Sequence, residues 1–424
     1  MGHYLPRVVD QELDELLAGV PAVALEGPKG VGKTVTSVRR ARTTYQFDQP
    51  AHRALFEADP KRFDGDPAPV LLDEWQRLPF VWDSVRRSVD RDPAPGRFLL
   101  AGSAVPVDAP VHSGAGRIVS VRMRPLALAE RGVAPAAVST AQLLAGDVDV
   151  LDGECDLDVA RYFEEIVASG FPGIRVATGR ARRALLDGYL QRIAQRDFRE
   201  QGQSVRKAAA LYAWMRAYAA ATGTNASYNR ILDAATPGEG DKPARSTTET
   251  YRHVLSDLWI LDPLPAWTPS DNRLHRLAQA PKHHLADPAL AARLLGMGVD
   301  GLLRGREAGP SAFRDGTLAG RLFESLVALS VRVYAQASDA RVGHFRTRNG
   351  DHEVDLVVER DDGRVLAIEV KMSGIVSDED VRHLSWLQGQ LGEDVVDAIV
   401  VTAGRHAYRR ADGIGVVPAG LLGP

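Results

Sequence analysis

A glycine-rich segment near the N-terminus carries a lysine and a threonine at a spacing that suits phosphate binding. The segment has the pattern G-x-x-x-x-G-K-[ST] and consists of Gly27, Pro28, Lys29, Gly30, Val31, Gly32, Lys33 and Thr34. Its glycines let backbone N–H groups turn toward phosphate oxygens, and the N-terminus of the following helix favours an anion. We expect Lys33 to contact the β- and γ-phosphates and the Thr34 hydroxyl to bind Mg²⁺. The segment predicts a P-loop for ATP and Mg²⁺; the alternative is a turn that binds no nucleotide.

Two carboxylates follow a short apolar run at residues 70–72. Asp73, at the end of the predicted strand, is placed to hold Mg²⁺ through water. Glu74 is placed to polarise the attacking water as a general base. Many strands end in acidic residues, so the pair is informative only because it follows a P-loop. Together with the P-loop it predicts ATP hydrolysis.

Two further polar residues could act on the γ-phosphate. Ser103 follows the apolar run FLLAG, and could position the phosphate or the water, or be an ordinary hydroxyl where a strand meets a loop. Arg117 lies in the glycine-flanked segment SGAGR, which suits an arginine finger that stabilises charge in the transition state. The finger could act in cis or on a neighbouring subunit, which would require a homo-oligomer. A structural arginine is the alternative.

A second group of candidate residues lies near the C-terminus. Asp355 is followed, across a gap that suits a hairpin, by Glu369 and Lys371, which share one face of a strand. If the strands pair, two carboxylates and an ammonium converge, as metal-assisted phosphodiester cleavage requires. Glu324, on a predicted helix, could add a third carboxylate that binds the metal ion. A salt-bridge ladder of cross-strand charges is the alternative.

The elements that position these residues follow from apolar runs. Residues 20–26, 70–72 and 97–101 predict buried strands separated by helices, hence a parallel sheet with helices on both faces. Helices then dominate to about residue 267, and the order helix, helix, helix, hairpin in residues 203–267 is typical of a winged helix. From about residue 281 the chain starts with helices and finishes with strands. We therefore expect an α/β protein with a helical middle.

Composition and charge limit the classes of protein to which this chain can belong. The 424 residues suggest several domains, with 45% apolar and 25% charged residues typical of a globular chain. The net charge of −3 gives no general case for nucleic-acid binding, although the stretch at residues 175–207 is basic and could be a docking face or a solvated helix. No apolar run is long enough to span a membrane. The N-terminus lacks the apolar core of a signal peptide, and one cysteine excludes an internal disulfide, so we expect a cytoplasmic protein.

Several motifs together resemble a large group of prokaryotic AAA+-type ATPases. They are LLDEWQRLP, FLLAGSA, GAGRIVSVRMRPLALAE, HFRTRNGDHEVDLVVE and AIEVKMSG. The resemblance covers nearly the whole chain. It implies nucleotide roles for Lys33, Thr34, Asp73 and Glu74, a sensor role for Ser103, an arginine role for Arg117, and a PD-(D/E)XK-like core at Asp355, Glu369 and Lys371. Gly30 departs from the polar residue expected at its position, which should not impair phosphate binding.

The resemblance and the patterns together divide the chain into four parts. They are a P-loop AAA+-like ATPase domain at residues 1–135, a helical lid or linker at 136–202, a winged-helix-like segment at 203–275, and a restriction-endonuclease-like α/β domain at 276–424. In a winged helix the third helix enters the major groove, so residues 247–253 would face DNA. Many winged helices instead contact proteins.

Two functions of different class fit these predictions. In the first, an ATPase acts on DNA and cuts it at Asp355, Glu369 and Lys371. In the second, ATP gates a binding switch whose nuclease-like domain is a silent platform for a protein or nucleic acid. The Asp…Glu-x-Lys residues favour the first function, and the lack of a general basic charge favours the second. A nucleotide-dependent regulator of a toxin or defence system is a third possibility.

Overall fold

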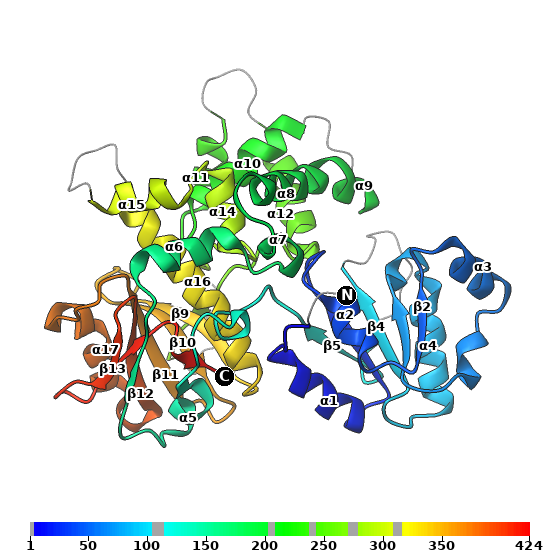
Figure 1. The fold of residues 1–424 in the computed structure, drawn as a ribbon, viewed down its shortest axis with the longest axis horizontal. Helices are drawn as coiled ribbons and strands as arrows, with labels where there is room; N and C mark the ends of the chain where they lie inside the picture. The colour runs from blue at the N-terminus through cyan, green and yellow to red at the C-terminus, as the bar shows by residue number, and fades with distance from the viewer. Residues whose placement is uncertain (1–3, 104–113, 202–207, 237–242, 270–278, 308–315) are drawn as a thin grey trace.

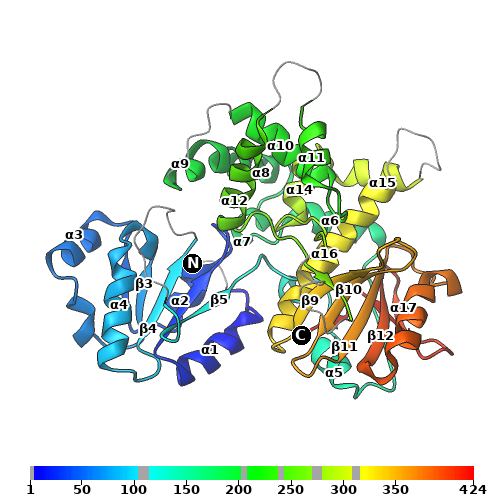
Figure 2. The same ribbon diagram turned by 180° about the vertical axis from the view of Figure 1, so that it is seen from behind.

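The computed structural model describes residues 4–103, 114–201, 208–236, 243–269, 279–307 and 316–424. The chain forms an N-terminal lobe, a helical middle part and a C-terminal lobe. The two lobes lie side by side below the helical part in both views (Figures 1 and 2). Each lobe is built around its own β-sheet.

The N-terminal lobe is a five-stranded parallel sheet with the order β2-β3-β4-β1-β5. The strands are β1 (Ala22–Glu26), β2 (Thr43–Gln46), β3 (Val70–Asp73), β4 (Phe98–Gly102) and β5 (Ile118–Arg122). The helices are α1 (Val9–Gly19), α2 (Lys33–Val38), α3 (Pro50–Ala58), α4 (Phe80–Arg91) and the 3-10 turns η1 (Arg62–Gly65), η2 (Trp75–Arg77) and η3 (Ala129–Arg131). The predicted parallel sheet is confirmed, and α2, the helix after the P-loop, ends at Val38.

Alternate residues of each central strand face opposite cores, because successive side chains of a strand point to opposite faces. Ala24, Leu72 and Leu100 pack with Phe56 of α3 and Val85 of α4 on one face of the sheet. On the other face, Val23, Leu71 and Leu99 join the core that includes α1 and continues into the rest of the molecule. Helices therefore cover both faces of the sheet, and the polar strand ends are left at its edge.

The middle of the chain is helical. Its elements are α6 (Val159–Ala168), α7 (Pro172–Arg175), α8 (Gly179–Arg192), the π-helical turn η4 (Ile193–Asp197), α9 (Phe198–Glu200), α10 (Ala208–Ala220), α11 (Tyr228–Ala234), α12 (Arg245–Asp257), α14 (Pro288–Leu294) and α15 (Val299–Glu307). After α12, residues 261–264 pair antiparallel with residues 282–285 through two isolated bridges. Three helices, α10, α11 and α12, precede this pair, whose second segment lies beyond the predicted residues 203–275, and the winged helix stays a prediction.

The C-terminal lobe is an eight-stranded mixed sheet with the order β7-β13-β14-β12-β11-β10-β9-β8. Its strands are β7 (Gly153–Glu154), β8 (Ala266–Trp267), β9 (Arg341–Arg346), β10 (Glu353–Glu359), β11 (Val365–Lys371), β12 (Val395–Thr402), β13 (His406–Arg409) and β14 (Gly415–Pro418). The helices α16 (Gly316–Gln336) and α17 (Asp378–Leu391), with the 3-10 turn η5 (Gly392–Asp394), complete it. Leu326 of α16 belongs to the core with Leu356 and Ile368, and Leu384 of α17 to the core with Val357 and Ala367. The two helices therefore cover opposite faces of the sheet.

The boundaries between the parts differ from the predicted ones. The segment assigned to a helical linker begins with β6 (Val138–Ser139), α5 (Thr140–Ala145) and β7, which pack against the C-terminal lobe. There β6 pairs with β15 (Leu422–Gly423), and β7 with β13. Conversely, α14 packs on α6 and α10 of the middle part, although it lies beyond residue 276. Short edge strands carry little sequence signal, so composition could not locate these exchanges.

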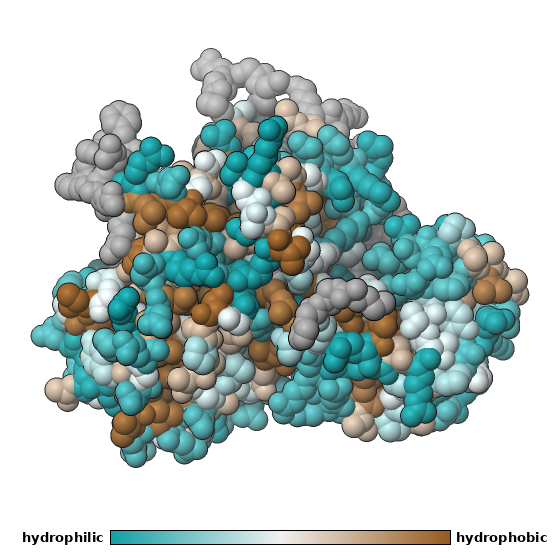
Figure 3. Space-filling view, viewed as in Figure 1, coloured by the Kyte–Doolittle hydropathy of each residue, from teal (hydrophilic) through white to brown (hydrophobic). Residues whose placement is uncertain are grey.

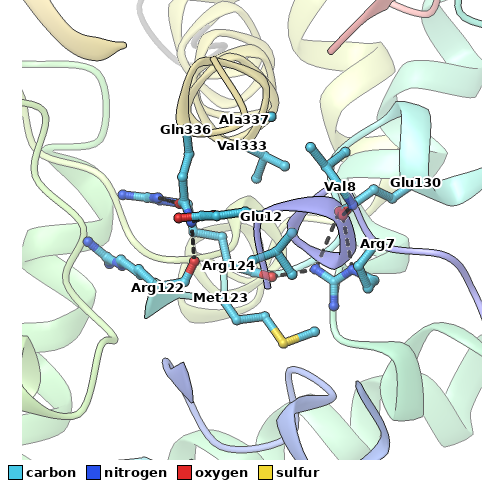
Figure 4. A pocket seen from close by; sticks show the side chains of 11 residues that line it. Arg7, Val8, Glu12, Arg122, Met123, Arg124, Glu130, Val333, Gln336 and Ala337 are labelled. Carbon is cyan, nitrogen blue, oxygen red and sulfur yellow. Dashed lines mark hydrogen bonds and ion pairs between the residues drawn. The ribbon is translucent and has the colours of Figure 1, made fainter. Parts of the chain in front are cut away.

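A buried ionic junction connects the three parts (Figure 4). Arg7, before α1, donates through Nε to Glu130 at 3.0 Å and through Nη2 to the Arg124 carbonyl at 2.7 Å. Gln336 of α16 donates to the Arg122 carbonyl at 2.9 Å. The residues around this junction leave a cavity of about 10 Å³, room for about one water molecule. The junction is therefore an interface rather than a ligand site.

Asp262, from the middle part, is the common acceptor of this junction. It pairs with Arg122 at 3.1 Å, Arg124 at 3.1 Å and Arg332 of α16 at 2.7 Å. Burial would raise the pKa of the Asp262 carboxyl, but the three guanidinium groups outweigh burial and lower it. One carboxylate thus joins the end of β5 to the C-terminal lobe.

On the face shown in Figure 3, hydrophilic side chains cover most of the N-terminal lobe, and apolar ones show in scattered patches. Within the described ranges, none of the helices combines the length and apolar character needed to cross a membrane.

Candidate nucleotide site and C-terminal acidic cluster

The predicted P-loop joins β1 to α2 at the carboxyl edge of the parallel sheet. Gly27, Gly30 and Gly32 all have positive φ, at 151°, 80° and 111°. At Gly27 a Cβ atom would lie 2.2 Å from the Met123 carbonyl oxygen, so glycine is required there. A side chain from outside the loop also holds it, because the Arg7 guanidinium donates a hydrogen bond to the Val31 carbonyl at 3.0 Å. Backbone geometry and packing therefore fix the loop.

Lys33 points back into the loop. Its ammonium donates to the carbonyl oxygens of Gly27 and Pro28 at 2.7 and 2.9 Å. The side chain is buried, and burial lowers the pKa of Lys33 to about 8, although the nearby carboxylates of Glu74 and Asp73 counteract the shift. A buried cation inside the loop is what an incoming phosphate needs as a partner.

Thr34 and Asp73 lie together as the sequence predicts. The Thr34 hydroxyl donates to Asp73 Oδ1 at 3.0 Å, linking the start of α2 to the end of β3. Burial raises the pKa of Asp73 to about 6, and the Thr34 hydrogen bond opposes that shift. A hydroxyl and a carboxylate at the edge of a phosphate loop are oxygen donors of the kind that Mg²⁺ prefers. These two residues therefore fit a Mg²⁺ ion that accompanies ATP.

Glu74 directly follows β3 in a left-handed conformation, with φ 55°. Gln76 Nε2 donates to Glu74 Oε2 at 2.8 Å and to Ser103 Oγ at 3.4 Å. Arg77 lies 3.8 Å from the same Glu74 oxygen. Ser103 follows β4, which lies between β1 and β3. The structure thus brings Glu74 and Ser103 together, and Gln76 connects them.

A cleft of about 300 Å³ opens beside these residues, between the N-terminal lobe and the helical part. Its lining consists of Lys29, Arg53, Glu74, Gln76, Arg77, Ser103, Glu200, Gln201 and Leu258. Lys29 of the P-loop crosses the cleft, and its ammonium pairs with Asp197 at 2.6 Å and Glu200 at 2.7 Å. Burial alone would lower the pKa of Lys29, but these two hydrogen bonds outweigh burial and raise it. The helical part therefore forms one wall of the candidate nucleotide site.

Arg117 lies away from this site. It directly precedes β5, which runs parallel to β1 with Ile118 beside Ala22. Arg117 is thus at the edge where β1 begins, whereas the P-loop follows the end of β1, roughly 16 Å along a five-residue strand. Its guanidinium pairs with Asp90 in the last turn of α4. The predicted finger acting in cis is therefore wrong, whereas a finger acting in trans and a structural arginine that pairs with Asp90 both stay predictions.

The C-terminal carboxylates converge, but they do so around a lysine. Lys282 Nζ lies 2.8 Å from Asp355 Oδ1, 2.8 Å from Glu353 and 3.1 Å from Glu324. Asp355 Oδ2 accepts the Val370 backbone N–H at 3.0 Å. We use the term acidic cluster for Glu324, Glu353, Asp355 and Glu369. The predicted pairing of β10 with β11 is present.

Glu369 and Lys371 complete the acidic cluster as an ion pair at 2.9 Å. The second oxygen of Glu369 is buried without a hydrogen-bond partner in the described part of the chain. Burial, and then the charge of Asp355, raise the pKa of Glu369 to about 8. Burial and Asp355 likewise raise the pKa of Glu324 to about 8. Among the described residues no three carboxylates, histidines or cysteines are arranged to hold a metal ion, so the predicted metal ligands Glu324, Asp355 and Glu369 do not fit one.

Lys282, Gln76, Arg77 and the acidic partners of Lys29 were not predicted. Lys282 and the acidic partners of Lys29 make their contacts across a long separation in sequence. Gln76 and Arg77 lie in the motif LLDEWQRLP, in which only Asp73 and Glu74 were assigned roles. Lys282 has one weak signal, since it is an isolated lysine next to two histidines. Those histidines, His283 and His284, are buried rather than solvent-facing.

The predicted DNA-reading helix is only partly exposed. On α12 the side chains of Arg245, Thr247 and His253 are exposed, but Thr248 is buried. Arg252 lies over the ring of Tyr228 at 4.7 Å. On α8 the side chains of Arg180 and Arg183 are exposed.

Known families match three separate parts of the chain. The AAA domain family matches residues 20–131, and two domains of unknown function, DUF8612 and DUF4143, match residues 159–300 and 319–422. The first match contains the P-loop, Asp73 and Glu74. Residues 20–131 are therefore similar to an AAA domain, which supports nucleotide binding and an ATPase-like function.

Relatives span nearly the full chain. Uncharacterised proteins of Mycobacterium bovis and Mycobacterium tuberculosis are each 26% identical over 416 residues, which is 96% of this chain and 82% of the relative. A solved structure, the Walker-type ATPase PABY2304 of Pyrococcus abyssi, is 16% identical with a TM-score of 0.38, covering 67% of this chain and 94% of that chain.

Proposed function

We propose that the protein binds ATP with Mg²⁺ and hydrolyses it at Lys33, Thr34, Asp73 and Glu74. The hydrogen bond between Thr34 and Asp73, at 3.0 Å, carries the proposal. It brings two oxygen donors from different elements to the edge of a loop that already holds a lysine ammonium. The two oxygen donors and the ammonium suit a triphosphate with a bound metal ion, whereas a glycine-rich turn that binds no nucleotide would not need them.

In the proposed reaction, water attacks the γ-phosphate in line with the leaving oxygen. Lys33 exchanges its two carbonyl partners for phosphate oxygens and neutralises their charge. Glu74, held by Gln76, orients the water and accepts its proton. Ser103, on the other side of Gln76, positions the γ-phosphate or the water. When bound by Thr34 and Asp73, Mg²⁺ adds positive charge to the phosphates.

ATP turnover by the purified full-length chain tests this proposal. Glu74→Gln keeps the shape of the side chain but cannot accept a proton, so we expect kcat to fall by about 10²–10⁴-fold with ATP affinity preserved. Lys33→Ala should lose ATP binding. Glu57→Gln, at an exposed position of α3, is the matched control. Turnover that is unchanged in Glu74→Gln would refute the role of Glu74, and no ATP binding by the wild type would refute the proposal.

For the C-terminal lobe two candidates remain, both with possible DNA or protein partners. The order α16, β9, β10, β11, α17, β12 supports a proposed restriction-endonuclease-like fold, in which Asp355, Glu369 and Lys371 would cut DNA. The lysine within the acidic cluster favours the alternative, an ATP-gated switch whose nuclease-like lobe is a silent platform for a partner.

Incubation with supercoiled plasmid and Mg²⁺ or Mn²⁺, with and without ATP, separates the two candidates. We expect ATP turnover without nicking. Nicking that disappears in Asp355→Ala would instead establish a nuclease, and its further loss in Lys33→Ala would couple cleavage to ATP.

A further inference from the structure

We infer that the Lys282 ammonium fills the place that a divalent cation would take in the C-terminal acidic cluster, so that the cluster is complete without a metal ion. The inference goes beyond the proposed ATPase, because it concerns a different lobe and a residue that no sequence motif singles out. It rests on the contacts, the anchoring and the charges around Lys282.

The contacts are those of an ammonium. The Lys282 ammonium donates hydrogen bonds to Glu324 at 3.1 Å and Asp355 at 2.8 Å, and it forms an ion pair with Glu353 at 2.8 Å. Metal ions such as Mg²⁺ and Ca²⁺ bind oxygens at about 2.0–2.6 Å. The distances from the three carboxylates to this nitrogen are therefore those of an ammonium.

The lysine is anchored where it lies. Its side chain is 3% exposed. Its backbone N–H donates to the Leu264 carbonyl at 3.0 Å, and its carbonyl accepts the Leu264 N–H at 2.9 Å. The following residue, His283, is held by backbone hydrogen bonds to Thr224 and Gly223. The backbone of Lys282 is therefore fixed, and its buried side chain extends from that fixed point to the acidic cluster.

The charges around the acidic cluster are already compensated. Lys371 pairs with Glu369, and Arg346 pairs with Glu353 at 3.2 Å. Together with Lys282, three cationic side chains therefore face the four carboxyl groups of the acidic cluster. A divalent cation added to this set would leave an excess of positive charge.

Lys282 also comes from a different part of the chain than the carboxylates. It lies in the segment before α14, which packs with the helical part, whereas Glu353 and Asp355 lie on β10. The ammonium therefore joins the helical part to the C-terminal lobe as well as neutralising the acidic cluster.

Mn²⁺ binding to the full-length protein, without nucleotide, tests the inference. Electron paramagnetic resonance of free Mn²⁺ or titration calorimetry provides the readout. In the wild type we expect no Mn²⁺ binding that depends on Asp355 up to about 1 mM. Saturable binding that is lost in Asp355→Asn but retained in Asp73→Asn would overturn the inference, because it would place a metal ion at this acidic cluster despite the lysine.

Lys282→Met provides the complementary measurement, since it keeps the length of the side chain and removes its charge. We expect it to gain a Mn²⁺ site at least tenfold tighter than any wild-type binding, and to lose that site in Lys282→Met/Asp355→Asn. Lys61→Met, which removes an exposed ammonium elsewhere, should show no gain. A folded Lys282→Met that gains no site would also overturn the inference. If that variant does not fold, the wild-type titration alone decides.

Discussion

At the scale of single residues, two buried groups of opposite charge define the nucleotide site. Asp73, with its pKa raised to about 6, carries its charge only above that pH. Lys33, with its pKa lowered to about 8, carries its charge only below that pH. Both shifts arise because burial disfavours the charged form. The pair is therefore fully charged in a window between these values.

This window predicts a pH dependence of ATP binding. We expect the KM for ATP to be lowest between about pH 6 and 8, and to rise on both sides as Asp73 gains a proton or Lys33 loses one. Because phosphate charge favours the ammonium form, ATP binding above pH 8 should also take up a proton. Titration calorimetry in buffers of different ionisation enthalpy measures this uptake.

The variant Lys33→Arg tests whether Lys33 causes the rise of KM above pH 8. Lys33→Arg keeps a positive charge throughout the range, so the rise of KM above pH 8 should disappear even if affinity falls overall. A persistent alkaline limb in this variant would show that another group causes it.

Lysine itself is informative in this chain. Only seven of its residues are lysines, and Lys29, Lys33, Lys282 and Lys371 lie in the two candidate sites. A lysine ammonium is a compact point charge, whereas arginine presents a planar fork. Elsewhere the chain uses arginine for its ion pairs. The scarcity of lysine could have directed attention to Lys282, although it could not have named its partners.

At the scale of elements, the loop between β1 and α2 depends on the strand beside it. The carbonyl of Met123, directly after β5, closes the space at Gly27. We expect Gly27→Ala to destabilise the fold by roughly 1–3 kcal/mol through overpacking, and to impair ATP binding because either the loop or β5 must move.

Thermal unfolding and ATP affinity of Gly27→Ala measure both effects. Gly30→Ala is the matched control, since Gly30 also has positive φ but no atom lies within 4 Å of the position that its Cβ would take. In Gly30→Ala the free energy of unfolding should fall only by the cost of placing alanine at positive φ, about 1 kcal/mol. Equal losses in the two variants would contradict the contact with Met123.

The strands and the P-loop could be predicted because their signals are local. The apolar run before Asp73 and the glycine pattern at Gly27 are readable in a few residues. The packing of β6 and β7 against the C-terminal lobe, and of α14 against the helical part, could not be predicted. Two-residue strands have no hydrophobic period that the sequence could reveal. The contacts of Lys29 and Lys282 join residues more than forty positions apart, and no local pattern encodes such pairs.

At the scale of the whole molecule, the position of Arg117 bears on whether one copy of the chain can complete the ATPase site. Because it lies at the edge of the sheet opposite its own P-loop, an arginine finger requires a second copy. We propose that it acts in trans within a homo-oligomer, so Arg117→Ala should lose turnover by about 10³-fold or more and keep ATP binding.

Mixing variants tests this directly. Arg117→Ala retains a P-loop but no finger, and Lys33→Ala retains a finger but binds no ATP. A mixture should regain turnover that neither variant shows alone. If Arg117→Ala is fully active by itself, the residue serves only its ion pair with Asp90.

The junction at Asp262 has a consequence for how the molecule can be divided. Three families match consecutive stretches of the chain, which invites the expression of each stretch as a separate module. Yet a fragment that ends near residue 135 keeps Arg122 and Arg124 and discards the carboxylate that holds them. The C-terminal fragment likewise keeps Arg332 without it. Repulsion between Arg122 and Arg124 would then replace attraction in the first fragment, and Arg332 would lose its partner in the last. We therefore expect each separate fragment to be less stable than the same residues within the whole chain.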